Sequence, residues 1–251
     1  MAASVISFPT MTVTRGKIES NLKRIRDDIA AACSRRGRDP QDVSIVAVTK
    51  TVEFDTIKNL LDAGMTNLGE SRVQQLTARA EEMKAYLQRR RNPLAAPVRW
   101  HMIGHLQRNK VKQAINAAKV IHSVDSLRLA EEINARAEQA GKHAEVMLEV
   151  NCSQEPQKYG VAVGATTHLA QLVSTLKCVT LTGLMTMAQI SSDPEKARPA
   201  FVRLRELFEE IRHEKICSED FRHLSMGMSQ DYGVAVEEGA TILRIGTAIF
   251  S

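Results

Sequence analysis

Eight short apolar runs, separated by longer segments with helical periodicity, limit the possible folds of this chain more than any other feature. Strands joined by helices run parallel, because each crossover returns the chain to the same edge of the sheet. Eight such units in 251 residues favour an α/β fold of the (β/α)8 TIM-barrel type over an open doubly wound sheet. The expected strands are Val43–Lys50, Met65–Ser71, Val98–Gly104, Lys119–Ser126, Ala144–Ser153, Val179–Ala188, Arg222–Ser229 and Thr241–Phe250.

The segments between these runs have apolar residues at helical spacing, and two of them close at glycines that suit a helix C-terminus, Gly64 and Gly141. An extra amphipathic helix, about Arg15 to Arg36, precedes the first strand. No second domain or internal repeat is evident, so we expect residues 1–251 to form a single barrel domain. The helical patterns between strands include Asp55–Gly64, Val73–Arg90, Ser126–Gly141, Thr167–Lys177 and Ala197–Arg212.

Several classes of protein have no support in the sequence. No apolar run approaches the length that crosses a bilayer, and no basic residue precedes the weakly apolar start of the N-terminal stretch MAASVISFPTMTVTRGK. The four cysteines are scattered without a C-x-x-C pair, which indicates neither a zinc site nor a disulfide framework. We therefore expect a cytoplasmic protein without a signal peptide or membrane span. Its oligomeric state is weakly constrained, and a monomer is expected.

Positive charge is the one compositional feature compatible with a nucleic-acid ligand. The formal net charge is +5, and arginines cluster within Ser34–Arg38 and Gln88–Arg91. Acidic residues are interleaved with basic ones elsewhere, and aromatic residues make up only 4% of the chain, too few for a base-stacking platform. We therefore interpret the clusters as solvated surface and do not expect nucleic acid as the main ligand.

Lys50 stands where the first apolar run stops, and the C-terminal ends of barrel strands form the functional face. Strand alternation groups Val46, Val48 and Lys50 on one side, so we expect the lysine amine to project from apolar walls into the barrel mouth. Desolvation there would lower the lysine pKa and favour the neutral amine, which attacks a carbonyl to make a Schiff base. The alternative is a lysine that merely snorkels at a strand end.

The last two strand-and-loop units have features typical of a phosphate site, because barrels frequently bind phosphate with the loops after strands seven and eight. Gly227 and Gly246 allow the backbone to approach an anion closely. Hydroxyl donors are available at Ser225, Ser229 and Thr247. Each glycine taken alone indicates a turn more often than a phosphate clamp.

Arg244 interrupts an otherwise apolar strand, and a buried arginine requires an acceptor or an anion. A structural ion pair inside the barrel is the alternative. A carbonyl-capturing lysine, a phosphate cradle and an arginine able to meet a ring nitrogen together favour a site for pyridoxal 5′-phosphate (PLP). The sequence has no dinucleotide-binding or P-loop signature and no H-E-x-x-H, so nucleotide and zincin interpretations have no motif to support them.

A resemblance to a known family covers nearly the whole chain. The motifs that carry it are VAVTK (Val46–Lys50), LGESRVQQL (Leu68–Leu76), WHMIGHLQRNK (Trp100–Lys110), HSVDS (His122–Ser126), LEVN (Leu148–Asn151), EPQKYGV (Glu155–Val161), GLMTM (Gly183–Met187), LSMGMSQDY (Leu224–Tyr232) and LRIGTAIF (Leu243–Phe250). In this order they resemble the pyridoxal-phosphate homeostasis proteins, also called the YggS/PROSC family. The resemblance implies a single barrel like the N-terminal domain of alanine racemase and a role in PLP binding and supply without established turnover.

The resemblance also implies roles for individual residues. This chain departs from the usual family pattern at Ser71, where asparagine is more common, so a cofactor contact from the second strand is in doubt. It also stops at Ser251, where relatives usually continue for a few residues. The residues assigned by the resemblance are Lys50 (Schiff base), Arg244 (pyridine nitrogen), Ser229, Gly246 and Thr247 (phosphate), with Ser225 and Met228 as neighbours of the cofactor.

Three functions remain open at this point. The favoured one is a protein that binds PLP and delivers it to recipient apo-enzymes. The second is a PLP-dependent enzyme resembling an amino-acid racemase, and the third is a Schiff-base aldolase that uses Lys50 on a phosphorylated sugar. Racemisation needs an acid–base group on each face of the substrate carbon, and we expect none from a second domain here. We interpret His101, His105, Tyr159 and Tyr232 as core, capping or loop residues rather than catalytic groups.

Overall fold

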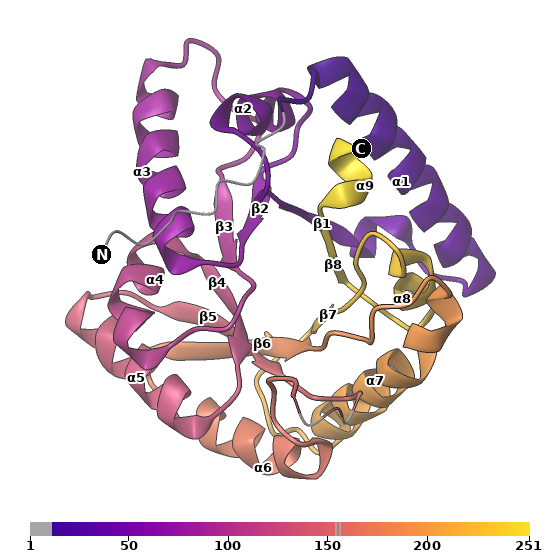
Figure 1. Ribbon diagram of the computed structural model, residues 1–251. Coiled ribbons are helices and arrows are strands. Elements are labelled where there is room, and N and C mark those ends of the chain that lie inside the picture. Colours follow the sequence, from indigo (N-terminus) through magenta and orange to yellow (C-terminus); the bar gives the residue numbers. More distant parts are fainter. Residues whose placement is uncertain (1–11, 154, 156) are drawn as a thin grey trace, which may run out of the picture.

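The computed structural model describes residues 12–153, 155 and 157–251. Eight parallel strands close into a barrel in sequence order, and β8 pairs with β1 (Figure 1). This confirms the TIM-barrel prediction, and every strand falls within one of the expected runs. The stretch used to predict the absence of a signal peptide lies mostly in residues 1–11, outside the described residues. The strands are β1 (Ser44–Val48), β2 (Asn67–Glu70), β3 (Arg99–Met102), β4 (Val120–Val124), β5 (Ala144–Glu149), β6 (Val179–Met185), β7 (His223–Ser225) and β8 (Ile242–Ile245).

Helices cover the outside of the barrel, as Figure 1 shows. The helices α2 and α5 are each followed by a glycine with positive φ, at Gly64 and Gly141, as expected. None of the helices that the described residues form is long and apolar enough to cross a membrane. The α-helices between and after the strands are α2 (Phe54–Asp62), α3 (Val73–Arg89), α4 (Val111–Ala117), α5 (Leu127–Gln139), α6 (Val163–Ser174), α7 (Arg198–His213), α8 (Tyr232–Glu237) and α9 (Thr247–Phe250).

The extra helix α1 (Arg15–Arg35) precedes the barrel, as the sequence predicts. It begins after Thr14, whose hydroxyl accepts a hydrogen bond from the Lys17 N–H. Its apolar face is buried, and it packs beside α2, α8 and α9 (Figure 1). From this face the Asn21 side-chain amide donates to the carbonyl oxygens of Ile249 and Ser251 at 2.9 and 2.8 Å. The helix α1 therefore binds the residues that follow β8 through these two hydrogen bonds.

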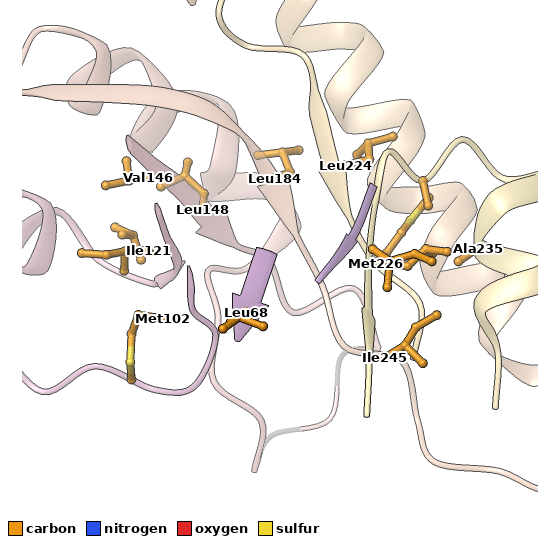
Figure 2. Close-up of a cluster of buried hydrophobic side chains, with 14 of the residues drawn as sticks. Leu68, Met102, Ile121, Val146, Leu148, Leu184, Leu224, Met226, Ala235 and Ile245 are labelled. Atoms are coloured by element: carbon orange, nitrogen blue, oxygen red, sulfur yellow. The ribbon is translucent and has the colours of Figure 1, made fainter. Parts of the chain in front are cut away.

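Apolar side chains form two separate layers, because successive strand residues point to opposite sides of the sheet. The outer layer lies between strands and helices, and Figure 2 shows part of it, including Leu68, Ile121, Leu184 and Ile245. A smaller cluster fills the inside of the barrel. Its members are Val46, Val120, Met147, Met185 and Ile242. The barrel interior is thus a packed core rather than a pore, and it also contains buried polar side chains such as His122 and Arg244.

One expected element is wrong in part. The strand expected over Thr241–Phe250 ends at Ile245, and the last four residues before Ser251 form the helix α9. The backbone leaves the strand at Gly246, and the Ile249 N–H then bonds to the Gly246 carbonyl at 2.9 Å. Ile249 and Phe250 are as buried as strand residues, and a short apolar run does not distinguish a buried strand from a buried helical turn.

Candidate functional site

Lys50 lies two residues beyond β1, at the C-terminal end of the barrel. Val46 points into the barrel, as the expected alternation requires. Beyond Val48 the chain turns, with the Val52 N–H bonded to the Thr49 carbonyl at 3.1 Å, so strand alternation no longer governs Lys50. Lys50 is exposed to solvent. The expectation that apolar walls desolvate its amine is therefore wrong, although its place at the mouth is confirmed.

A buried clamp holds the backbone on both sides of Lys50. The Arg79 guanidinium, on α3, donates to the carbonyl oxygens of Thr49 and Val52 at 2.5 and 2.6 Å. Arg79 also pairs with the Glu70 carboxylate, which accepts a further hydrogen bond from the Thr49 hydroxyl. Burial raises the pKa of Glu70, and the charges of Arg79 and Lys50 oppose this rise. The Lys50 side chain is thus exposed to solvent, while hydrogen bonds from Arg79 hold the backbone of its turn.

Arg244, in the middle of β8, is 4% exposed and therefore almost fully buried. Its Nη1 donates to the Ser225 hydroxyl at 2.7 Å and its Nη2 to the Thr186 carbonyl at 2.9 Å. No carboxylate among the described residues forms an ion pair with it, so the structural ion pair considered above is wrong. Burial lowers the Arg244 pKa to about 10, against the opposing charges of Glu149 and Asp231, and the group stays protonated at neutral pH.

The loops after β7 and β8 meet beside this arginine. Gly227 has a φ of +91°, and a Cβ there would come within 2.5 Å of the Ala235 Cβ, so the turn requires glycine. The Met228 N–H donates to the Asp231 carboxylate at 2.6 Å and fixes the first loop. Ser229 joins the two loops, because its Oγ accepts the N–H of Ala248 at 3.1 Å.

The residues predicted to hold phosphate are at the open rim. Ser229 and Gly246 are half-buried, and Thr247 is exposed. A Cβ at Gly246 would come within 3.3 Å of the Val48 carbonyl oxygen, so β1 and the second loop approach closely there. β1 and β8 pair with Val46 opposite Arg244, which places the Lys50 turn and this loop at the same end of adjacent strands. The hydroxyls, the loop backbone and the amine fit a phosphorylated aldehyde.

Other polar residues surround the mouth. Glu149 ends β5 and is buried, and this burial raises its pKa to about 7, with Arg244 opposing and Asp125 adding to the rise. The rings of His105 and Tyr159 stack at 3.9 Å in neighbouring loops, and His105 Nδ1 lies 3.4 Å from the Asp125 carboxylate. His105 and Tyr159 are thus loop residues, as expected.

Two further residues considered in the sequence, Tyr232 and Ser71, contact other parts of the protein. The Tyr232 hydroxyl donates to the Asp28 carboxylate at 2.5 Å, which attaches α8 to α1 and agrees with a packing role. Ser71 follows β2 and is half-buried, and its carbonyl is so close to Gly104 that a Cβ there would come within 2.3 Å. The contact between the second and third strands is therefore formed by backbone at Ser71.

The residues near the site that were not predicted from the sequence include Glu70, Arg79, His122 and Thr186. Two of them left a signal. Glu70 is a charged residue at the end of a buried strand, and His122 is a polar residue inside a fully buried one, and such groups require partners. Arg79 and the Thr186 carbonyl left none, because their partners are distant in sequence.

The barrel, with its lysine after β1 and its arginine in β8, defines the class of protein. Residues 17–251 match the family model described as alanine racemase, N-terminal domain. This match covers most of the chain and includes every strand of the barrel. The protein is therefore a barrel of the alanine-racemase N-terminal class, as the resemblance implied.

Individual relatives narrow the class further. A pyridoxal phosphate homeostasis protein of Aquifex aeolicus is 38% identical over 229 residues, which cover 91% of this chain and 95% of the relative. That of Escherichia coli strain K12 is 32% identical over 237 residues, which cover 93% and 95%. The chain thus belongs to the pyridoxal phosphate homeostasis protein family, which confirms the resemblance found in its sequence.

Solved structures agree with this family. An unknown protein from Bifidobacterium adolescentis superposes with a TM-score of 0.88 at 36% identity, covering 97% of this chain and all of the other. PipY of Synechococcus elongatus, solved with PLP bound, gives a TM-score of 0.77 at 29% identity, covering 93% of this chain and all of PipY. Both structures match the barrel along its whole length.

Proposed function

We propose that this protein binds pyridoxal 5′-phosphate at the barrel mouth through a Schiff base on Lys50. We further propose that it serves intracellular homeostasis and delivery of this cofactor without substantial turnover. The observation that carries the proposal is the pairing of β1 with β8, which brings the exposed Lys50 turn beside the Gly246 loop above the buried Arg244. The PLP-bound structure of the relative PipY supports it.

Different residues around the mouth would bind different parts of the cofactor. Ser229, Thr247 and the backbone at Gly246 would hold the phosphate, because hydroxyl and N–H donors form strong hydrogen bonds to an anion. Arg244 would face the ring nitrogen, with Ser225 and Met228 as its neighbours. When bound, the cofactor would supply a reactive aldehyde, and the Lys50 amine would hold it through the proposed Schiff base.

The exposure of Lys50 favours a carrier. Water has access to the exposed Lys50, and this access would favour release of a bound aldehyde. Enzymes instead close the site to water to protect reactive intermediates. Arg244 favours a carrier as well. A guanidinium donates hydrogen bonds only, and a charged one disfavours protonation of a ring nitrogen, which weakens the electron sink needed for transamination.

The carrier would act on apo-enzymes that need this cofactor, in the cytoplasm and as a monomer. Purified protein should be yellow, with a visible absorption band that borohydride removes by reducing the Schiff base. Added to an apo-aminotransferase, the loaded protein should restore activity while its own band declines. A colourless protein that borohydride labels only with a sugar phosphate would support the aldolase instead.

A second experiment separates the carrier from a racemase-like enzyme. Loaded protein is incubated with single L- and D-amino acids, and chirality, keto acid and carbon dioxide are followed. We expect binding of the cofactor but no conversion at rates typical of enzymes, about 1 per second or more. Turnover at several per second that is lost in Lys50→Ala would replace the carrier by the enzyme.

A further inference from the structure

A chain of hydrogen bonds runs through the inside of the barrel and ends at Arg244. From Arg244 it passes to the Ser225 hydroxyl, then to His122 Nδ1 at 2.9 Å. His122 Nε2 lies 2.9 Å from His101 Nδ1, and His101 Nε2 lies 3.3 Å from the Asn67 Oδ1. The five side chains come from five strands, β8, β7, β4, β3 and β2, so only the closed barrel brings them together.

The direction of every hydrogen in this chain follows from the Asn67 end. The Asn67 Oδ1 can only accept, so His101 Nε2 must donate to it, and the donors then point from Arg244 toward Asn67. His101 therefore carries its proton on Nε2, and its bare Nδ1 accepts from His122 Nε2–H. The bare Nδ1 of His122 then accepts from Ser225, whose lone pair is left to accept from Arg244. The opposite tautomers would set two acceptors against each other at Asn67.

Both histidines must be neutral for this arrangement to hold. They are 4% and 0% exposed, and burial lowers the pKa of His101 to about 3 and that of His122 well below its usual value. A protonated His122 would donate from both nitrogens. It would also place a second cation beside Ser225, the residue that bonds to Arg244. Around physiological pH each ring is therefore a fixed dipole with one donor and one acceptor.

The aligned dipoles stabilise a buried cation that has no ion pair, in addition to the more distant charges of Glu149 and Asp231. Each group in the chain turns its lone pair toward Arg244, so the negative ends of four dipoles face the guanidinium. The Thr186 carbonyl does the same from the other side. Hydrogen bonds in a chain polarise one another, and their effect is large where the dielectric constant is low. No other described residue accepts a hydrogen bond from the Arg244 guanidinium.

We propose that His101 and His122 are positioning residues that, through Ser225, hold Arg244 charged and oriented toward the pyridine ring of the cofactor. The inference rests on the proposed function only for the identity of the ring that Arg244 meets. It predicts a defined tautomer for both histidines in the protein without cofactor. It also predicts that His101 needs nothing more than an acceptor at the Nδ1 position to support His122.

The tautomers are measured first, by two-dimensional ¹H–¹⁵N NMR of the histidine rings in the cofactor-free protein. We expect His101 and His122 each to carry the proton on Nε2, with no charged form from about pH 5 to 8. This measurement does not depend on PLP binding. Nδ1–H tautomers, or a charged ring in this range, would overturn the inference.

The second test compares His101→Asn with His101→Leu, two side chains of nearly equal shape. Asparagine retains an acceptor near the Nδ1 position, and leucine does not. We expect His101→Leu to weaken PLP and unphosphorylated pyridoxal about tenfold and by the same factor, and to shift the absorption maximum of the bound form. His101→Asn should bind both within about threefold of the unaltered protein. Thermal unfolding of each variant reports whether the barrel is intact.

His223→Leu is the matched control, because His223 is also a barrel-strand histidine but contacts Thr241 outside the chain. It should leave affinity and spectrum unchanged. Equal binding by a folded His101→Leu, or equal losses in the asparagine and leucine variants, would overturn the positioning role. A protein that binds no PLP at all, with both tautomers as expected, would instead overturn the proposed function and leave the hydrogen-bond chain standing.

Discussion

The two sides of the candidate site hold their cations in opposite ways. At β1 the backbone around Lys50 is clamped by Arg79, while the lysine side chain is exposed. At β8 the Arg244 side chain itself is buried and bonded to Ser225 and Thr186. In the proposed function the Lys50 amine forms and releases a covalent bond, which requires access to water and freedom to move. Arg244 is proposed to orient a ring, which requires a fixed position, and burial supplies it.

The two sides also differ in how a buried charge is stabilised. The clamp at β1 contains a true ion pair, between Glu70 and Arg79, that bonds to the main chain. The chain at β8 hydrogen-bonds one cation to neutral groups, and the charges of Glu149 and Asp231 act on that cation without forming an ion pair with it. An ion pair removed on one side leaves a buried charge, whereas a chain of dipoles can be weakened one member at a time. Four sets of substitutions test this contrast.

The largest effect is expected for Lys50→Ala. The variant should lose the visible band completely, because no other residue is proposed to bond covalently to the cofactor. The exposed side chain contributes little to the core, so thermal unfolding should be nearly unchanged. Absorption spectra with saturating PLP and a melting curve measure both. A band of unchanged position and intensity would show that the Schiff base forms on a different lysine.

Arg79→Leu tests whether the clamp matters to the fold. It leaves the Glu70 carboxylate buried without its partner, and breaking such a pair costs roughly 3–5 kcal/mol of unfolding free energy. Denaturant unfolding measures this loss, and adding Glu70→Gln should restore part of it. Arg15→Leu, which breaks the exposed Arg15–Glu19 pair of α1, is the control and should leave the unfolding midpoint in place. Equal midpoints for both single variants would contradict a buried clamp.

Glu149 makes the arginine side sensitive to pH. Its pKa is about 7 in the folded protein and about 4.5 when unfolded, so the folded state binds this proton more tightly. The resulting stabilisation is complete below pH 4.5 and is lost as pH rises through 7. It amounts to about 3 kcal/mol. Glu149→Gln should remove this part of the pH dependence, as measured by denaturant unfolding from pH 4 to 8. Parallel stability curves for the two proteins would contradict the assignment.

The smallest effects are expected at the rim. Ser229→Ala and Thr247→Ala should each weaken PLP by about 1.5–3 kcal/mol, the contribution of a hydrogen bond to a charged group. Unphosphorylated pyridoxal should bind these variants almost as it binds the unaltered protein. Titrations followed by absorbance compare the two ligands. Equal losses for both ligands would place these hydroxyls away from the phosphate. The expected difference between the two ligands contrasts with the equal losses expected from His101→Leu.

The barrel could be predicted from local pattern, and the residue roles at the site stay predictions. The apolar runs that include Val46 and Ile242 indicate strands without knowledge of their partners, and a lysine and an arginine stand out against them. The environment of each side chain could not be read in the same way. Lys50 is exposed because the strand ends two residues early, and α9 replaces the end of the last expected strand.

By itself, the sequence determined the order of the eight strands, the barrel and the family, because periodicity and ordered motifs are local properties of the chain. Only the tertiary structure decided which cation is buried, which turn Arg79 clamps, and which residues meet between Asn67 and Arg244. Those contacts join residues far apart in sequence, such as His122 and Ser225, which are 103 positions apart. Their hydrogen bonds depend on the register of closed strands, and no local pattern encodes that register.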